Sequence, residues 1–379
     1  MLRIGSLFSG YGGLDSAVQE VFGGSLAWVA DPAPGPSKLL AYRHPDVPNL
    51  GDITAVDWSA VEPVDIITGG SPCQDLSSAG RRAGMTDGTR SNLWVQMREA
   101  INVIRPKLVV WENVRGALSA VAASAVESEP RLLGDGQRGP ALRAIGRVVG
   151  DLADLGYVGG WVGLRVADLG GCHGRFRIFL LARAADSDGS GLQGLVHRCR
   201  TPQTRGSGHP ESGAGGSDLT LLRTPTAQLA INGGSQHPDK RKAGGHGPTL
   251  ADEVEHLLPT PSVADAAGGH ERRGGKRGGE LLLKGLAKHG HLDRFGRYAQ
   301  AIASHERLAG RPAPSPTEPG AKGKPRLSSS FVEWMMCLPE GWVTDVPGLS
   351  RSEQLALLGN GVVPPQAAAA LRHLLERAA

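Results

Sequence analysis

The sequence has few cysteines and no long apolar run. Its four cysteines, Cys73, Cys172, Cys199 and Cys337, are scattered over 379 residues and form neither a Cys-x-x-Cys pair nor a cysteine–histidine cluster with zinc-ligand spacing. We therefore expect no metal site and no disulfide framework. No stretch reaches the roughly 18 apolar residues of a transmembrane helix, and the N-terminus lacks the charged start and apolar stretch of a signal peptide. We expect a soluble cytoplasmic protein that does not bind membranes.

A strong excess of charge is also missing, since the formal net charge is +4. The charge is unevenly distributed: residues 184–326 hold 20 basic and 14 acidic side chains, whereas residues 1–183 hold 18 of each and residues 327–379 hold 3 and 5. A positive middle segment is expected where a protein meets phosphates. A solvated basic surface would have the same charge, so charge alone does not decide between the two.

Strand-like and helix-like patterns alternate over the first 183 residues. Strands are expected at 2–8, 26–30, 64–68 and 108–111, with a short segment before Asp52, helices at 14–22, 37–43 and 93–104, and closing strands at 163–167 and 177–182. Repeated β-α units of this kind predict an α/β fold, with a parallel sheet covered by helices on both faces.

The alternating pattern ends near Ala184. Residues 184–326 are rich in Gly, Pro, Ser, His and Arg, which suits either a disordered linker or a loop-rich second domain. Regular patterns return at 328–338 and 355–358, and a final alanine-rich helix is expected at about 365–377. The expected organisation is one unit at 1–183, a second region at 184–326, and a C-terminal segment at 327–379 that completes the first unit.

Polar side chains follow the predicted strands at the points where these end. They are Ser9, Asp31, Asp52, Cys73 and Glu112. In an open parallel sheet, ligands bind at the carboxyl ends of the strands. Five such placements from independent strands predict one shared site.

Glycines follow the first strand at Gly10, Gly12 and Gly13, just before the first helix. They let the backbone approach a ligand, and the helix N-terminus favours negative charge; a tight structural turn would look the same. Asp31 lies about twenty residues further on, where an acid can accept hydrogen bonds from ribose hydroxyls. A surface aspartate beside a proline is the alternative.

Cys73 follows a proline on a glycine-rich loop, where a thiolate would be exposed and reactive. Most single cysteines are instead small buried side chains. Glu112 follows an apolar strand, so burial would raise its pKa and make it a proton donor; a helix-capping acid is the alternative. Arg175 and Arg177, two residues apart, would point the same way from a strand, unless they are solvent-facing arginines at its entrance.

In content and order, these motifs resemble those of the cytosine-C5 DNA methyltransferases, over residues 1–183 and 327–379. The most specific match is Ser71-Pro72-Cys73-Gln74, which is similar to the family's nucleophile motif. The other matches are Phe8 to Gly13 with the first cofactor motif, Asp31 with the ribose acid, Asp52 with the adenine contact, Glu112-Asn113-Val114 with the Glu-Asn-Val motif, His173 to Arg177 with Gln-x-Arg-x-Arg, and Gly359 to Val363 with the last motif. The chain departs from the family where His173 replaces glutamine and Asp31 the usual glutamate.

The resemblance implies a Rossmann-like S-adenosylmethionine methyltransferase domain with a parallel-rich sheet, plus a smaller loop-rich target-recognition domain. The residues it implies for the cofactor, S-adenosyl-L-methionine, are Phe8, Ser9, Gly10, Gly12, Gly13, Asp31, Asp52, Asn360 and Val362. It implies catalytic roles for Cys73, Glu112, Arg175 and Arg177, and substrate contacts for Pro72 and Asn113.

The implied reaction is methylation of carbon 5 of a cytosine in double-stranded DNA. Methyltransferases flip the target base out of the duplex, at a cost of roughly a few kcal/mol. We expect a monomer that acts in the bacterial cytoplasm and is encoded either by the bacterium or by a bacteriophage. A cognate restriction endonuclease is a further partner to test.

Three other functions fit part of the sequence. A tRNA methyltransferase of the same family would share the motifs, but the long basic insert favours DNA. An inactive DNA-binding regulator would not need the intact Pro-Cys and Glu-Asn-Val motifs. A nicotinamide-dependent oxidoreductase would suit the sheet and the glycine turn, but it leaves the Pro-Cys loop and the last motif unexplained.

The middle segment contains an internal repeat, because residues 221–251 resemble residues 257–287 at a constant offset of 36. Leu-Leu, Thr-Pro, Lys-Arg and Leu-Ala recur in one register. Self-similarity at a fixed period indicates a repeated structural unit, with biased Gly and Arg composition as the alternative. We predict two modules whose pairs, Lys240-Arg241 and Lys276-Arg277, contact DNA phosphates.

Overall fold

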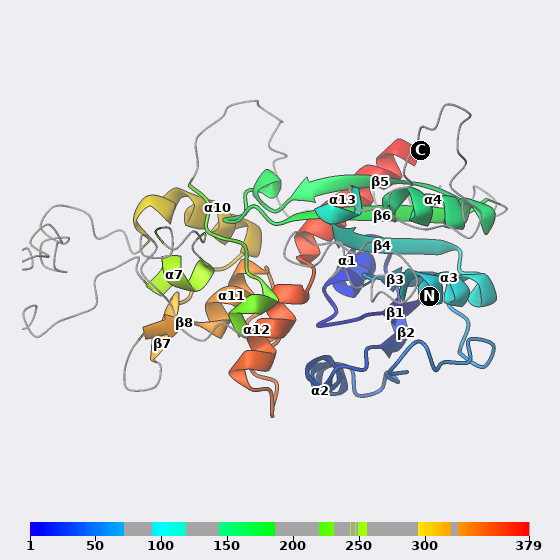
Figure 1. Cartoon of the computed structure of the whole chain (residues 1–379), viewed down its shortest axis with the longest axis horizontal. Coiled ribbons are helices and arrows are strands. Elements are labelled where there is room, and N and C mark those ends of the chain that lie inside the picture. Colours follow the sequence, from blue (N-terminus) through cyan, green and yellow to red (C-terminus); the bar gives the residue numbers. More distant parts are fainter. Residues whose placement is uncertain are drawn as a thin grey trace, which may run out of the picture.

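The computed structural model describes residues 1–71, 93–118, 144–185, 220–230, 243, 247, 249–255, 295–319 and 325–378. Within these residues the chain forms a six-stranded sheet and a second, smaller body beside it (Figure 1). No helix of the described part is long and apolar enough to cross a membrane.

The sheet has the order β2-β1-β3-β4-β6-β5. Its strands are β1 (Arg3–Leu7), β2 (Ser25–Ala30), β3 (Ile66–Gly69), β4 (Leu108–Val114), β5 (Tyr157–Arg165) and β6 (Phe176–Ala184). The pairs β1–β2, β1–β3 and β3–β4 are parallel, whereas β6 runs antiparallel to both β4 and β5. The sheet is therefore mostly parallel, as the sequence predicted, with one reversed strand near its edge.

Helices cover both faces of this sheet, because its central strands are apolar on both sides. On one face α1 (Gly13–Phe22) packs with α13 (Pro364–Ala378), in a core that includes Val18, Phe179 and Leu371. On the other face α3 (Leu93–Ile104) and α4 (Ala144–Asp154) bury Trp94 and Val148. The helix α2 (Pro34–Arg43) follows β2.

Three sequence predictions need correction in detail. The closing strand expected at 163–167 is β5, which begins at Tyr157 and ends at Arg165. The strand expected at 108–111 extends to Val114, so Glu112 and Asn113 lie within β4 instead of following it. The short segment before Asp52 forms only an isolated bridge between Asn49 and Val29 instead of a strand. In all three places the chain follows backbone pairing with a neighbouring strand, which local sequence patterns do not reveal.

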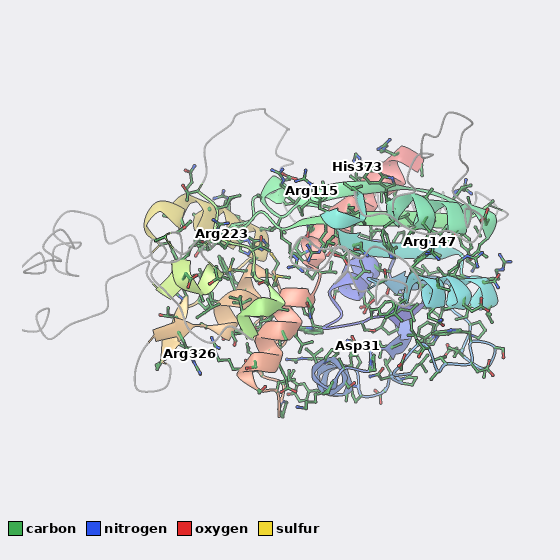
Figure 2. The ribbon with its side chains drawn as sticks, viewed as in Figure 1. Asp31, Arg115, Arg147, Arg223, Arg326 and His373 are labelled. Carbon is green, nitrogen blue, oxygen red and sulfur yellow. The ribbon has the colours of Figure 1, made fainter. Side chains whose placement is uncertain are left out.

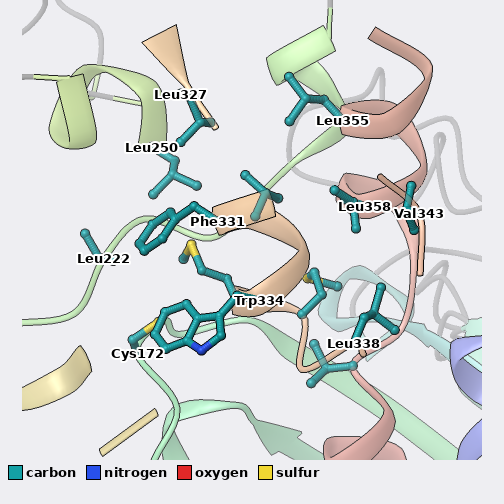
Figure 3. Packing of buried hydrophobic residues seen from close by; sticks show 14 of the residues in the cluster. Cys172, Leu222, Leu250, Leu327, Phe331, Trp334, Leu338, Val343, Leu355 and Leu358 are labelled. Carbon is teal, nitrogen blue, oxygen red and sulfur yellow. The ribbon is translucent and has the colours of Figure 1, made fainter. Parts of the chain in front are cut away.

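The second body is built around a separate apolar core (Figure 3). It includes α7 (Leu250–Glu255), α10 (Ala299–Ala309), α11 (Ser329–Met335), α12 (Arg351–Asn360), and the hairpin of β7 (Thr317–Pro319) with β8 (Pro325–Leu327). Phe331 and Trp334 on α11 lie at its centre. The C-terminal segment is thus shared: α11 and α12 belong to this second core, whereas α13 returns to the sheet.

Candidate active site

A cavity of about 620 Å³ opens at the carboxyl ends of β1 to β4. The predicted residues that line it are Phe8, Ser9, Gly10, Gly13, Asp31, Asp52, Glu112, Asn113, Arg177, Asn360 and Val362. Four of the five polar residues predicted to meet from their places near strand ends, Ser9, Asp31, Asp52 and Glu112, therefore do line one cavity. Pro72 and Cys73 lie outside the described residues, but Ser71, which precedes them, lines the same cavity.

The glycine turn after β1 has the backbone that the sequence suggested. Gly10 and Gly12 have φ of 56° and 80°, in the left-handed region that favours glycine, and Gly12 caps α1. A Cβ on Gly13 would overlap the carbonyl oxygen of Val362. That oxygen also accepts a hydrogen bond of 2.7 Å from the hydroxyl of Tyr11. The first and last motifs of the chain therefore form one wall of the cavity.

Asp31 lies directly after β2, and its carboxylate accepts hydrogen bonds from the glycine turn and from the start of α2. Oδ2 accepts a hydrogen bond of 3.0 Å from Gly10 N–H, and Oδ1 accepts one of 3.1 Å from Ala33 N–H. Partial burial raises the pKa of Asp31, and these two hydrogen bonds oppose that shift. Asn49 fixes the backbone of the same residue, because its side chain bonds both the N–H and the carbonyl of Asp31. Figure 2 shows Asp31 close to α2.

Asp52 differs from Asp31 in being exposed to solvent. Its Oδ1 accepts hydrogen bonds from the backbone N–H of Thr54, at 3.0 Å, and from the Thr54 hydroxyl, at 2.8 Å. These bonds lower the pKa of Asp52, so its carboxylate is ionised at neutral pH at the rim of the cavity.

Sequence reasoning missed a third acid, Asp15, which is buried at the floor of the same cavity. Its carboxylate accepts hydrogen bonds of 2.8 Å from the Ser6 hydroxyl and 2.6 Å from the Thr68 hydroxyl. Burial raises the pKa of Asp15. The available signal was its position in the first turn of α1, between the apolar residues Leu14 and Ala17.

Glu112 is the acid that the sequence predicted as the proton donor, and it lines the cavity. It is 8% exposed, and its Oε1 lies 2.7 Å from Nε of Arg177 on the neighbouring strand β6. Burial raises the pKa of Glu112, and the positive charge of Arg177 partly offsets this. The alternative interpretation of Glu112 as a helix-capping acid is wrong, because Glu112 lies within β4 and its side chain lines the cavity in an ion pair with Arg177.

Residues on β4 also fix the start of the segment that contains the Pro-Cys motif. Asn113 Nδ2 donates a hydrogen bond of 3.2 Å to the carbonyl of Ser71, and Trp111 Nε1 donates one of 3.1 Å to the Ser71 hydroxyl. Asn113 is almost fully buried. The strand that presents Glu112 therefore anchors the residue two positions before Cys73.

Arg175 and Arg177 have different partners, although their spacing suggested a shared direction. Arg177 pairs with Glu112. Arg175 is 2% exposed and donates from Nη1 to the carbonyls of Pro225, at 3.1 Å, and Gly359, at 3.0 Å. Its Nη2 donates to Gly361. These hydrogen bonds connect the loop that contains Arg175 with Pro225 and with the segment at 359–361. Arg175 does not line the cavity.

The predicted DNA-contacting residues Lys240, Arg241, Lys276 and Arg277 lie outside the described residues. Two arginines of the second body, Arg223 and Arg326, lie away from Asp31 in Figure 2. Each is about half exposed and forms an ion pair, with Glu253 and Glu318 respectively.

A glycine turn and acids at the carboxyl edge of a mostly parallel sheet are typical of α/β proteins that bind nucleoside-containing cofactors. Residues 2–210 match the family described as C-5 cytosine-specific DNA methylase. The match covers more than half of the chain, and the chain belongs to this family. The resemblance drawn from the motifs is thereby confirmed at the level of the family.

Among curated proteins, the chain is 38% identical over 128 residues to a DNA N-6-adenine-methyltransferase of Escherichia phage P1, covering 29% of this chain and 17% of that protein. It is 35% identical over 132 residues to the Type II methyltransferase M.AquIA of Picosynechococcus sp., covering 32% of this chain and 52% of that protein. The matched region thus spans at most about half the length of these relatives.

Among solved structures, the chain is similar to the Dnmt2 methyltransferase of S. pombe, with a TM-score of 0.51 and 14% identity over 100% of this chain and 99% of that one. The methyltransferase EhMeth of Entamoeba histolytica gives the same TM-score, identity and coverage. At this identity the likeness concerns the fold alone, and it confirms the Rossmann-like α/β class.

Members of this family take their methyl group from S-adenosylmethionine. The cavity fits this cofactor: it has a glycine turn at a helix N-terminus, where backbone can approach a carboxylate, and the acids Asp31 and Asp52 beside it. Val362 and Asn360 close the opposite wall.

Proposed function

We propose that the chain methylates carbon 5 of cytosine in a specific double-stranded DNA sequence, with Cys73 as the attacking nucleophile. The observation that supports this most directly is the buried Glu112–Arg177 pair in a cavity that is also lined by Ser71, the residue that precedes the Pro-Cys motif in the sequence. A buried acid and a fixed cation beside a nucleophile are the groups that this chemistry requires.

The cofactor half of the site would be held by residues from both ends of the chain. Gly10 and Gly13 would allow close backbone contact with the methionine part, and Asp31 would accept from the ribose. Asp52 would lie near the adenine, with Asn360 and Val362 on the other side. S-Adenosylmethionine supplies the methyl group when it is bound there.

The base half of the site solves a chemical problem, since carbon 5 of cytosine is a poor nucleophile. Addition of the Cys73 thiolate to carbon 6 makes carbon 5 enamine-like, through a covalent intermediate. Glu112 would hold N3 and the exocyclic amine and supply the proton that favours addition, which its raised pKa supports. Arg177 would orient the base and Glu112. Carbon 5 would then take the methyl group as its bond to the cofactor sulfur breaks, and loss of the carbon 5 proton with expulsion of the Cys73 thiolate would complete the reaction.

Arg175 would then have a positioning role and would not contact the base, because its guanidinium donates hydrogen bonds to the backbone carbonyls of Gly359 and Gly361. Region 184–326, with its positive excess, would contact the DNA and select the target base, which is flipped into the cavity. Type II methyltransferases among the relatives make a cognate restriction endonuclease a partner worth testing.

The test is bisulfite sequencing of DNA from cells that express the wild type or Cys73→Ala. We expect protected cytosines in one sequence context with the wild type and none with the variant. A duplex containing 5-fluorocytosine should trap a covalent complex with the wild type only. Normal turnover by Cys73→Ala would exclude the nucleophile, and methylated tRNA with unmodified DNA would point to the RNA substrate instead.

A further inference from the structure

The loop at 170–175, which leads into β6 and Arg177, is fixed by contacts with the second body. Cys172 donates its backbone N–H to Nδ1 of His305, at 3.2 Å, and its carbonyl accepts from Leu222 N–H, at 2.8 Å. His305 lies on α10 and Leu222 in the segment at 220–230. Two elements of region 184–326 therefore bond one residue of this loop.

Burial and hydrogen bonds determine the charge and the tautomer of the His305 ring. The side chain is fully buried, and burial lowers its pKa to about 4, so the ring is neutral at physiological pH. A neutral imidazole has one donor and one acceptor nitrogen. Because Nδ1 accepts from Cys172, Nε2 carries the proton and donates to the carbonyl of Trp334, at 3.1 Å.

His173, which lies in the loop itself, is a second neutral imidazole that bonds both this loop and α11. It is fully buried and its pKa is lowered to about 3. Its Nε2 lies 2.9 Å from the carbonyl of Met335, and its Nδ1 accepts from Arg175 N–H at 3.4 Å. Trp334 and Met335 are consecutive residues in the last turn of α11, where carbonyls lack the i+4 partner of the helix interior, although that of Trp334 also accepts from Cys337 N–H at 2.9 Å. The two imidazoles therefore tie one helix end to the loop.

We propose that His305 is a positioning residue, which holds the loop at 172–175 so that Arg177 meets Glu112 at the reaction centre. This inference rests on the proposed function of the Glu112–Arg177 pair. His305 does not line the cavity, so it acts only through the loop. It also makes the alignment of Arg177 depend on α10, an element of the predicted target-recognition region.

His305 offers a matched pair of substitutions, because the two amide side chains each reproduce one ring nitrogen. The amide of His305→Asn reaches the position of Nδ1 and can accept from Cys172 N–H. The amide of His305→Gln reaches the position of Nε2 and can donate to Trp334, but it leaves Cys172 without its acceptor. The two variants thus separate the loop contact from the helix contact. His373→Gln, at an exposed position on α13, is the control.

Amide hydrogen exchange of residues 172–177 is measured first, without DNA or cofactor. We expect faster exchange in His305→Gln than in His305→Asn. With DNA, kcat of His305→Gln should lie roughly tenfold to a hundredfold below that of His305→Asn, because a displacement of about 1 Å can cost this much. The dissociation constant of S-adenosylmethionine and the KM for DNA should change far less than kcat.

Equal exchange and equal kcat in the two variants would overturn the proposal, as would a kcat order that simply follows thermal stability. If both variants fold poorly, ¹⁵N NMR of wild-type imidazoles decides: a proton on Nδ1 of His305 contradicts the assigned contact, and one on Nε2 supports it. Wild type that methylates no DNA would refute the proposed function, while the exchange result would still report on the loop.

Discussion

Glu112 combines two features that usually oppose each other, a buried carboxyl group and a bonded cation. Its place after an apolar strand predicted burial and a raised pKa, and the structure agrees on both. The ion pair with Arg177 was not predictable, because it depends on β6 running antiparallel beside β4 in the register that pairs Glu112 with Phe179. This register lets two residues 65 positions apart meet at 2.7 Å.

Replacing Glu112 with Gln removes the ionisable group and keeps the shape. We expect kcat to fall roughly 10²- to 10⁴-fold, the usual contribution of a positioned acid or base. Affinity for S-adenosylmethionine, measured by calorimetry, should be little changed, since Glu112 would contact the base. A rate within a factor of about three of wild type would remove Glu112 from the proton-donating role.

Asp31 gives a second prediction at the scale of one residue. Asp31→Ala should weaken binding of S-adenosylmethionine about tenfold to a hundredfold, because it removes an acceptor for the ribose and frees the N–H of Gly10. Calorimetry without DNA measures this. Asp31→Asn, which keeps one acceptor oxygen, should lie between wild type and Asp31→Ala. Unchanged affinity in Asp31→Ala would show that the ribose is held elsewhere.

At the scale of elements, sequence patterns located most helices and strands of the catalytic part within a few residues, but they missed α4 and placed the start of β5 six residues too late. They could not give the reversed direction of β6, because local apolar periodicity does not encode the direction of pairing. Nor could they predict that Asp15 is buried in the cavity, because its hydrogen-bond partners Ser6 and Thr68 come from two different strands. The cavity was predictable as a place, from polar residues at strand ends, but its hydrogen-bond network required the structure.

The repeat at 221–251 and 257–287 is an element-scale prediction that the described residues cover only in part. Replacing Lys240 and Arg241, or Lys276 and Arg277, with alanine should weaken DNA binding similarly across sequences. Removing each side chain that binds a phosphate should flatten the dependence of log K on log salt by about one unit. Unchanged affinity and slope in both double variants would exclude these pairs as DNA-positioning groups. A changed target sequence with a constant slope would show that they read bases.

At the scale of the molecule, the C-terminal segment joins the two bodies. The sequence predicted that 327–379 completes the catalytic unit, and α13 does pack on the sheet. However, α11 and α12 lie in the second core, and His173 and His305 bond the end of α11. Sequence patterns could not show this division, since an apolar helix face indicates burial but not the core against which it packs.

The two buried histidines predict how the stability of the whole molecule depends on pH. Their folded pKa values, about 3 for His173 and about 4 for His305, lie below the ordinary value of 6.5. Burial is the main cause for both. His305, Arg175 and Arg177 lower the pKa of His173 further, and Arg311 that of His305. Between these values and 6.5 the unfolded chain binds more protons than the folded one, so stability is fully present above 6.5 and is lost as pH falls.

Urea denaturation at pH 7 and pH 5 tests this. Each histidine should contribute up to about 2 kcal/mol to the loss of stability over that interval. Burial raises the pKa values of Asp15 and Glu112, which acts in the opposite direction, so the wild-type profile alone does not isolate the histidines. The comparison is with His173→Gln/His305→Asn, which lacks both imidazoles but retains one hydrogen-bonding group at each site. Its stability should fall less between pH 7 and pH 5, and parallel profiles would show that the two histidines are not buried and neutral in the folded protein.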